Sequence, residues 1–533
     1  MDTHQGSGSS ASNAGAMAQS IPSGLSFDAW WHVCSLLCTY CQDTNPNKVD
    51  GSVISCGRLF RVSGEEMDGR LRLLAVLCRT SKTLREAATP HLYHSVYLRG
   101  NPTPLFHRLV KTVSSRPQLA NYVKYILFDG PPSDENPDSA ISVNQPLTSM
   151  LSDIAASSGV TLPHGWPEMT VWKYELFLLG LLVANTPNVK GMRIWLDDQQ
   201  EGGTFQAIWM MLYPPAGPRL QGLKELIIGG GPCPKVLRLD ITRLISAATN
   251  LRTLSLECNQ LIINPYAVPN LGSVTSLSFH GNIRLASVAL IVRACGPLEV
   301  FHIDLGYGCS FGVEIGHIGL VVGALQQHRE TLKTLGLRDF FGTVSRPPRA
   351  NGDITALQEF GELEYLFITA RLFKRDWKGG LVDSEADDAE YDTDDDPHEY
   401  EEDPPLWEPD LNPCPNLVEM LPRSAKELHF ADEVTVDFLE GLKLLLAAVD
   451  QGEFDELREI VLYHRRDSHD PLAAMRDDIQ RRFGEYNSGS IVRYTTLPAE
   501  YEKRVGKVRG GEVATCVHGS DDHSLGFPGP GDV

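Results

Sequence analysis

The sequence predicts an α/β protein in two parts: a small helical module over residues 25–98, then an irregular repeat solenoid over residues 99–510. Two observations lead to this prediction. A short apolar phrase recurs along most of the chain, and helix-like stretches separate its copies. Self-similarity of this kind is typical of a repeat architecture, in which the strands align into one curved parallel sheet backed by helices.

The recurring phrase has the form LxxLxLxxN, which is the strand segment of a leucine-rich repeat. Two copies fit at every position, one from Leu251 to Asn259 and one from Val274 to Asn282. Looser copies begin at eight further positions: Val123, Val189, Leu223, Leu298, Leu332, Leu363, Ala425 and Leu457. Leucine-rich chains produce single matches by chance, but ten starts indicate a true repeat. Two gaps, of 66 and 62 residues, leave room for an insertion or an unrecognised repeat.

Helix-like stretches lie between the copies, for example over 240–249, 286–295 and 317–329. The last stretch places four residues near one helical face: Val321, Val322, Leu325 and His328. A strand buries its alternate apolar residues only under a helix layer, and no single repeat can supply that layer alone. The pattern therefore favours stacked repeats over the three or four separate domains that length alone predicts.

The net charge of −21, from 47 Lys and Arg against 68 Asp and Glu, argues against a nucleic-acid binder or a protein of anionic membrane surfaces. No apolar run approaches the roughly 20 residues that span a bilayer. Residues 1–24 and 511–533 are expected to be disordered tails, and the first shows no signal-peptide pattern. Eleven cysteines, an odd number, without a secretory signal favour reduced thiols and a cytoplasmic or nuclear location.

An acidic run interrupts the repeats inside a predicted disordered insertion at 381–410. It holds 13 acidic residues and no Lys or Arg between Asp383 and Asp403, so it is expected to stay solvated. Subtracting these 13 charges leaves −8, so most of the net charge belongs to one segment. The alternatives are an electrostatic lure for a basic partner and a phosphorylation site at Ser384 or Thr393.

The N-terminal module begins with a predicted helix from Leu25 to Cys38. Ser26 can cap it, Asp28 suits its first turn, and three residues share a face: Trp30, Val33 and Leu37. Residues 71–88 contain two further helical stretches. The chain is then predicted to turn at Pro90 and to become strand-like up to Leu98.

These residues resemble the F-box of fungal F-box/leucine-rich-repeat proteins. The closing half of the family pattern is matched by Leu74, Leu77, Cys78, Ser81, Lys82, Leu84, Arg85, Ala88, Pro90, Leu92 and Tyr93, and its opening by Leu25, Asp28, Trp30, Val33 and Leu37. The sequence departs from the family at Ser26, where proline is usual, and its central loop is longer. Residues 105–128 resemble the linker that follows the F-box in the same proteins.

The resemblance implies a non-enzymatic substrate-recognition subunit of a Skp–cullin–F-box ubiquitin ligase. An F-box docks on a Skp-type adaptor, which joins a cullin–RING ligase, while the repeats hold a protein substrate. The implied adaptor-binding residues are Leu25, Asp28, Trp30, Val33, Leu37, Leu74, Leu77 and Leu84. The alternative within the binding class is a leucine-rich-repeat scaffold whose divergent F-box no longer engages the adaptor.

The substrate is expected on the concave face of the solenoid, where strand residues that flank the buried ones point away from the core. The candidates are Glu257, His280, His302, Asp304, Arg338, Asp339, Tyr365 and Phe367. Solvated strand residues without a partner are the plainer interpretation of each one.

The enzymatic alternative is a serine hydrolase with Ser310 at a nucleophile elbow, because Gly308–Gly312 fits GxSxG between a strand-like and a helix-like run. Asp339 and His464 could complete a triad, but no HGGG-type oxyanion motif precedes them. A repeat loop explains the same glycines. The glycine-rich segment 229–235 lacks the ending of a phosphate-binding loop, so it is also interpreted as a repeat loop.

Cysteines 34, 38 and 41 match the CxxxCxxC spacing of radical iron–sulfur enzymes. They fall on a predicted helix rather than in a loop, which favours a packed helix face. A zinc site completed by His32 or Cys56 is a weaker alternative, because a second pair of ligands is missing from the neighbourhood. The sequence therefore predicts no catalytic, cofactor-binding or metal-binding residues.

Overall fold

The computed structural model describes residues 26–38, 41, 64–99, 103–129, 145–160, 162, 166–168, 171–196, 220–230, 245, 247–257, 270–281, 283–305, 318–339, 354–369, 416–431, 436–464 and 492–496. The two predicted tails and the predicted acidic insertion lie outside these residues. Leu25, Cys56 and the Gly308–Gly312 motif lie outside them as well.

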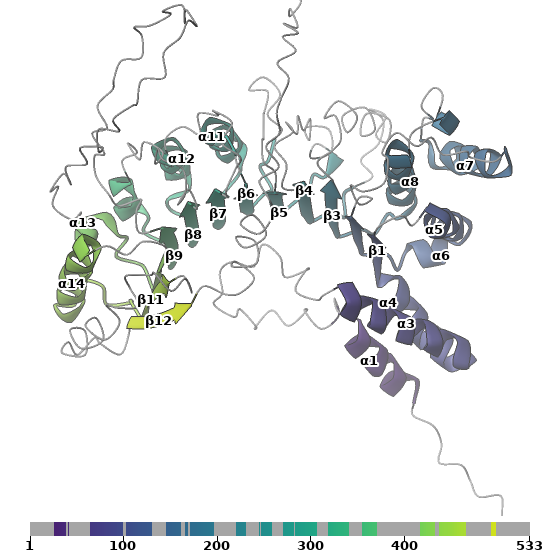
Figure 1. The fold of residues 1–533 in the computed structure, drawn as a ribbon, viewed down its shortest axis with the longest axis horizontal. Helices are drawn as coiled ribbons and strands as arrows, with labels where there is room; N and C mark the ends of the chain where they lie inside the picture. Colours follow the sequence, from purple (N-terminus) through teal and green to yellow (C-terminus); the bar gives the residue numbers. More distant parts are fainter. Residues whose placement is uncertain are drawn as a thin grey trace, which may run out of the picture.

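Twelve strands of the described chain form one sheet, and each strand pairs in parallel with its neighbours. Their order in space follows the sequence, from β1 to β12 (Figure 1). The strands are Ser95–Arg99 (β1), Tyr125–Asp129 (β2), Gly191–Leu196 (β3), Glu225–Gly230 (β4), Thr253–Glu257 (β5), Ser276–His280 (β6), Val300–Leu305 (β7), Thr334–Asp339 (β8), Tyr365–Thr369 (β9), Glu427–Ala431 (β10), Glu459–His464 (β11) and Val492–Thr496 (β12). The α/β class and the parallel sheet are confirmed, and the strand order is compatible with a repeat solenoid.

The ten repeat phrases locate ten of these strands, because each strand from β2 to β11 begins two residues after the start of a phrase. The phrase at Leu251, for example, leads into β5 at Thr253. No phrase was recognised for β1 or β12. Since β1 pairs with β2, the sheet begins at Ser95, inside the range assigned to the helical module.

One face of the sheet is the apolar core. The second and fourth residues of each strand from β1 to β11 are buried there, as with Leu254 and Leu256 in β5, which are at most 1% exposed. These residues join the apolar faces of the helices in one continuous cluster that runs from Val96 to Leu462. Fully burying one such side chain stabilises the fold by about 1.5–3 kcal/mol.

Helices cover this core face, along the outer side of the row of strands (Figure 1). They are α5 (Thr103–Ser115), α6 (Pro117–Ala120), α7 (Gln145–Ser158), α8 (Val171–Asn185), α11 (Leu285–Ala294), α12 (Ile318–Leu325), α13 (Leu417–Met420) and α14 (Val436–Asp450), with the 3-10 turns η2 (Trp166–Glu168), η4 (Gln326–His328) and η5 (Thr355–Glu359). The helices predicted at 286–295 and 317–329 correspond to α11 and to α12 with η4. The stretch predicted at 240–249 is described only in part.

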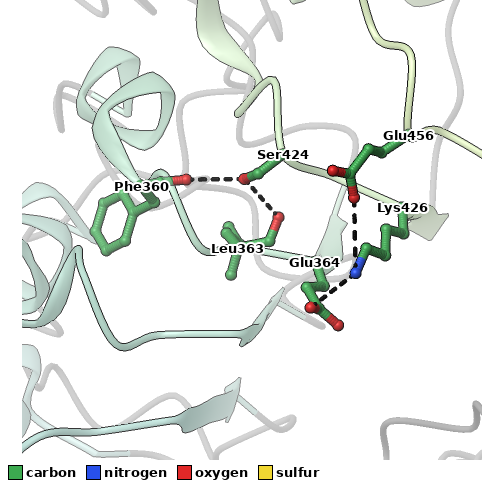
Figure 2. A network of polar contacts seen from close by, with 6 residues as sticks. All are labelled: Phe360, Leu363, Glu364, Ser424, Lys426 and Glu456. Atoms are coloured by element: carbon green, nitrogen blue, oxygen red, sulfur yellow. Dashed lines mark hydrogen bonds and ion pairs between the residues drawn. The ribbon is translucent and has the colours of Figure 1, made fainter.

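The turns that precede successive strands are tied to one another. The amide of Lys426 donates to the carbonyl of Glu364, and the amide of Arg458 donates in turn to the carbonyl of Lys426. Side chains reinforce this ladder: the Lys426 ammonium lies 2.8 Å from Glu364 and 3.6 Å from Glu456. The Ser424 hydroxyl donates to the carbonyls of the preceding turn (Figure 2). Such bonds satisfy backbone groups that no strand or helix pairs.

Three helices form the N-terminal module: α1 (Phe27–Leu37), α3 (Gly64–Thr80) and α4 (Lys82–His94). Ser26 caps α1 as predicted, since its hydroxyl accepts from the Ala29 amide at 3.3 Å. The predicted turn at Pro90 is wrong, because α4 continues through Pro90 to His94. Proline removes only one amide from a helix, and here the helix ends just one turn later.

Candidate functional site

The predicted adaptor-binding residues fall partly in the interior of the helical module. Leu74 and Leu84 are 1% and 8% exposed, so they belong to its core and not to its surface, contrary to the sequence prediction. Three others are half-buried against the same core: Trp30, Leu37 and Leu77. Asp28 is exposed and Val33 is half-buried. The error arose because α3 carries apolar residues on more than one side, and periodicity alone does not tell which side packs inward.

A different set of apolar residues faces solvent. Phe27, Trp31 and Leu36 of α1, with Leu73 and Val76 of α3, are 40–51% exposed. Only eight large apolar side chains in the described part of the chain are at least 40% exposed, so the module carries more than half of them. Exposed apolar side chains gathered on one small unit are typical of a protein-binding surface.

The concave face consists of the first, third and fifth residues of the strands, which point away from the helices. Seven of the eight predicted substrate-binding residues lie on it in register. The eighth, Asp339, pairs with Leu305 at the end of β8, and its side chain lies outside the described residues.

The centre of the concave face is packed rather than solvated. His302, Asp304, Arg338 and Phe367 are between 1% and 6% exposed, whereas the sequence predicted solvent-facing side chains. Three other candidates are half-buried: Glu257, His280 and Tyr365. Large side chains on adjacent strands, about 4.8 Å apart, cover one another when they stand in register.

Charges meet at the middle of this face. The Asp304 carboxylate lies 3.7 Å from Nδ1 of His280 and 3.9 Å from the Arg338 guanidinium, whose side chain is completely buried. Burial alone would raise the pKa of Asp304. The hydrogen bond from His280 and the positive charges of Arg338, His280 and His302 outweigh burial and lower that pKa.

Aromatic rings extend the packing toward β11. The Arg338 guanidinium lies over the Phe367 ring at 5.8 Å, and that ring lies 6.3 Å from the His429 ring. Nδ1 of His429 lies 3.0 Å from the Tyr463 hydroxyl. Phe367 and Tyr463 belong to a second, small apolar cluster on the concave face, together with Ala431 and Val461. The middle of this face is therefore closely packed, and its half-buried rim is the part that a partner could contact.

Two glycines make room for rings on this face. A Cβ atom at Gly229 would lie 2.3 Å from the Trp195 ring, and one at Gly336 would lie 2.0 Å from the His302 ring. Each glycine is the register partner of the ring residue on the adjacent strand, Gly229 of Trp195 and Gly336 of His302. Gly229, the first residue of the glycine-rich segment 229–235, thus has a packing role.

We expect Gly336→Ala to lower the free energy of unfolding by about 1–2 kcal/mol, because the buried His302 ring must turn away from the new methyl group. Urea denaturation of the full chain measures this loss. Gly361→Ala serves as the control, because a Cβ atom at Gly361 meets nothing within 4 Å. Equal stabilities of Gly336→Ala and the wild type would show that the ring does not depend on this glycine.

A cluster of four metal-binding side chains lies where the helical module meets the sheet. It consists of Cys38 and Cys41, after α1, and of His91 and His94, in the last turn of α4. All four donor atoms lie within 4.8 Å of one another. The sequence prediction of no metal-binding residue missed this group, because its two halves are about 50 residues apart. The spacing HxxH on a helix was the available signal.

The pKa values of the two thiols in the cluster are shifted in opposite directions. Hydrogen bonding from Cys41, and then from His91 and His94, lowers the pKa of Cys38 despite its burial. The bond with Cys38 and burial raise the pKa of Cys41. Cys34 is separate: it is completely buried in the module core with Leu74, and burial raises its pKa. The three cysteines therefore do not form one CxxxCxxC ligand set, and Cys34 is packed in the module core, as the sequence analysis favoured.

A second, weaker group on the concave face contains Glu427, His429 and Glu459. Oε2 of Glu427 lies 3.5 Å from Nε2 of His429. The other ring nitrogen of His429 contacts the Tyr463 hydroxyl, and both carboxylates are half-exposed, as carboxylates commonly are without a metal.

The hydrolase alternative gains no support from the topology. Ser310 lies outside the described residues, as does the side chain of His464. The twelve strands follow one another in order, whereas doubly wound sheets, which carry ligand sites at strand ends, reverse their strand order at one point.

Comparison with known proteins adds little. No family model and no curated protein matches the chain. Among solved structures, a protein from Bacteroides fragilis shows 12% sequence identity and a TM-score of 0.28, over 58% of this chain and 66% of that one. A likeness this weak carries no functional argument. No helix in the described ranges is long and apolar enough to cross a membrane.

Proposed function

We propose that this protein is a non-enzymatic substrate-recognition subunit, which recruits a protein substrate to a Skp–cullin–F-box ubiquitin ligase. The observation that carries the proposal is the exposed apolar surface on α1 and α3 of the small helical module. An amphipathic helix pair with exposed aromatic side chains suits docking into an apolar groove of a partner. The resemblance of residues 25–98 to an F-box supports a Skp-type adaptor as that partner.

The repeat sheet supplies the second half of the proposal. Its concave face is long, and its half-buried rim carries both charge and aromatic surface, in Glu257, His280 and Tyr365. The packed centre keeps these side chains in fixed positions, which favours selective binding because little order is lost on association. We propose that the substrate contacts this rim and not the buried Asp304–Arg338 pair.

We expect the double variant Trp31→Asp/Leu73→Asp to bind a Skp-type adaptor at least about 30-fold more weakly than the wild type, since central apolar anchors contribute 2 kcal/mol or more to an interface. Pull-down and calorimetry with the full chain measure this loss. Leu444→Asp is the matched control, because Leu444 is an exposed leucine on α14, 55% exposed and in the solenoid.

The outcomes separate the two binding functions. A wild-type chain that does not bind the adaptor would favour the scaffold alternative. A double variant that binds as tightly as the wild type would mean that the docking surface lies elsewhere on the module.

A further inference from the structure

Four donor atoms converge on one point at the end of α1. Sγ of Cys41 lies 3.2 Å from Nδ1 of His94 and 3.5 Å from Nδ1 of His91, and Sγ of Cys38 lies 3.4 Å from Nδ1 of His94. In a tetrahedral zinc site, with Zn–S near 2.3 Å and Zn–N near 2.0 Å, sulfur and nitrogen ligands are about 3.6 Å apart. The observed separations are close to that edge length, so a small outward movement would admit the ion.

Local structure explains the convergence. Cys38 and Cys41 bracket a single turn after α1, in which the Cys41 amide donates to the Cys38 carbonyl at 3.0 Å. His91 and His94 are three residues apart on α4, which places them on the same helical face. The two pairs therefore form a CxxC and HxxH ligand set of the kind that structural zinc sites use.

The surroundings of the cluster are largely apolar, and two of its four side chains, those of Cys41 and His94, are half-buried. Cys38 and His91 are only 4% and 5% exposed. Cys38 packs against Leu127 of β2, with Cys41, Leu71, Tyr97 and Tyr125 around them. Nε2 of His91 has no hydrogen-bond partner in the described part of the chain, and its ring meets the Trp31 ring edge-on at 4.7 Å. An apolar shell on this side limits the access of competing water to an ion.

We propose that Cys38, Cys41, His91 and His94 bind one structural Zn²⁺ ion, which joins the end of α1 to α4 and fixes the helical module against strands β1 and β2. Four protein ligands leave no open position for a substrate, so the role is structural rather than catalytic. The ion would set the direction in which the apolar surface of the module points relative to the concave face. This inference does not depend on the identity of the adaptor.

A redox-active dithiol is the competing explanation of the CxxC pair. Dithiol exchange requires an attacking thiolate that a partner can reach, and Cys38 is almost completely buried. The redox explanation also does not account for the two histidines that contact the same sulfur atoms. Metal coordination accounts for all four side chains at once.

The test is metal titration of the full chain, purified under reducing conditions and stripped with a chelator. We expect one Zn²⁺ per chain, and with Co²⁺ the ligand-field bands of a tetrahedral ion together with thiolate charge-transfer bands. Cys41→Ser and His94→Ala should each weaken Zn²⁺ binding at least about 100-fold, because a ligand contributes more than the 10–100-fold of its supporting residues. Cys41→His retains a ligand and should keep the one-to-one stoichiometry with weaker charge-transfer bands.

Two control variants and a folding measurement complete the test. His32→Ala and Cys295→Ser remove a neighbouring histidine and a solenoid cysteine outside the cluster, and should bind as the wild type does. Removal of zinc should speed amide exchange in α1 and leave β6–β8 unchanged. The proposal fails if the wild-type chain binds no stoichiometric Zn²⁺, if Cys41→Ser and His94→Ala bind it undiminished, or if Cys38 and Cys41 form a disulfide and no zinc site.

Discussion

Replacing Arg338 with alanine should lower the free energy of unfolding by about 3–5 kcal/mol, because it removes the buried guanidinium that faces a buried carboxylate. The Arg338 side chain is completely buried and lies 3.9 Å from Asp304, whose side chain is 8% exposed. Alanine also removes the group that lies over the Phe367 ring. Chemical denaturation of the full chain, followed by circular dichroism, measures the loss.

The loss should depend on pH in a defined direction. The pKa of Asp304 is lowered in the folded protein, so its contribution to stability is present above the unfolded pKa, about 3.9, and is lost as pH falls through the folded pKa. Without Arg338 the folded pKa rises, because one of the charges that favour the carboxylate is gone. The difference between wild type and variant should therefore be largest near pH 7 and shrink below about pH 4.

A double variant separates the stability lost through the unpaired charge from the stability lost through the smaller side-chain volume. Arg338→Met keeps most of the buried stem, and Asp304→Asn removes the charge that is left unpaired. Replacing both members of a buried pair usually costs far less than breaking it, so Arg338→Met/Asp304→Asn should recover a large part of the stability that Arg338→Met loses. A pH-independent loss, or no recovery in the double variant, would contradict the assignment of Asp304 and Arg338 as an energetic pair.

The strands were predictable because their signal is local. The six residues Leu251-Arg-Thr-Leu254-Ser-Leu256 are enough to predict both a strand and its buried positions. Because similar phrases repeat along the chain, their strands are expected to pair in parallel. The outer strands differ: β1 carries no repeat phrase and was expected only as a strand-like end of the helical module, and β12 was not predicted, since terminal repeats are atypical in sequence. The sequence predicts too early an end for α4, because proline usually ends a helix. In the structure the buried residues on both sides of Pro90 belong to one continuous helix.

The site residues were less predictable because their positions depend on distant partners. The repeat phrase predicts to which face of the sheet each strand residue points. The exposure of that residue, however, depends on which side chain lies beside it on the next strand. His302 is buried because Gly336 leaves space for its ring, and no pattern within either phrase indicates this pairing. The Cys38–His94 contact joins residues 56 positions apart, and only the packing of α1 on α4 brings them together.

Gly296→Ala should destabilise the fold by about 3 kcal/mol, because the new methyl group would meet backbone and no side chain could move aside. A Cβ atom at Gly296 would lie 2.1 Å from the carbonyl oxygen of Gly272 and 2.9 Å from its carbonyl carbon. Two backbone bonds hold the segments in this position: Leu271 donates to Ala294 at 3.2 Å, and Gly296 donates to Leu271 at 3.3 Å. Relief of the clash would require these turns, which lead into β6 and β7, to separate.

Two other glycines provide matched controls, measured together with Gly296→Ala by urea denaturation of the full chain. Gly323→Ala places a methyl group in open space on α12 and should stabilise the protein by about 0.5–1 kcal/mol, since alanine favours a helix over glycine. Gly272→Ala adds a methyl group whose only neighbour within 4 Å is the Asn270 side-chain oxygen, at 3.1 Å, so its effect should be small. If Gly272→Ala costs as much as Gly296→Ala, general strain in these turns explains the loss, and the contact between Gly296 and the Gly272 carbonyl does not.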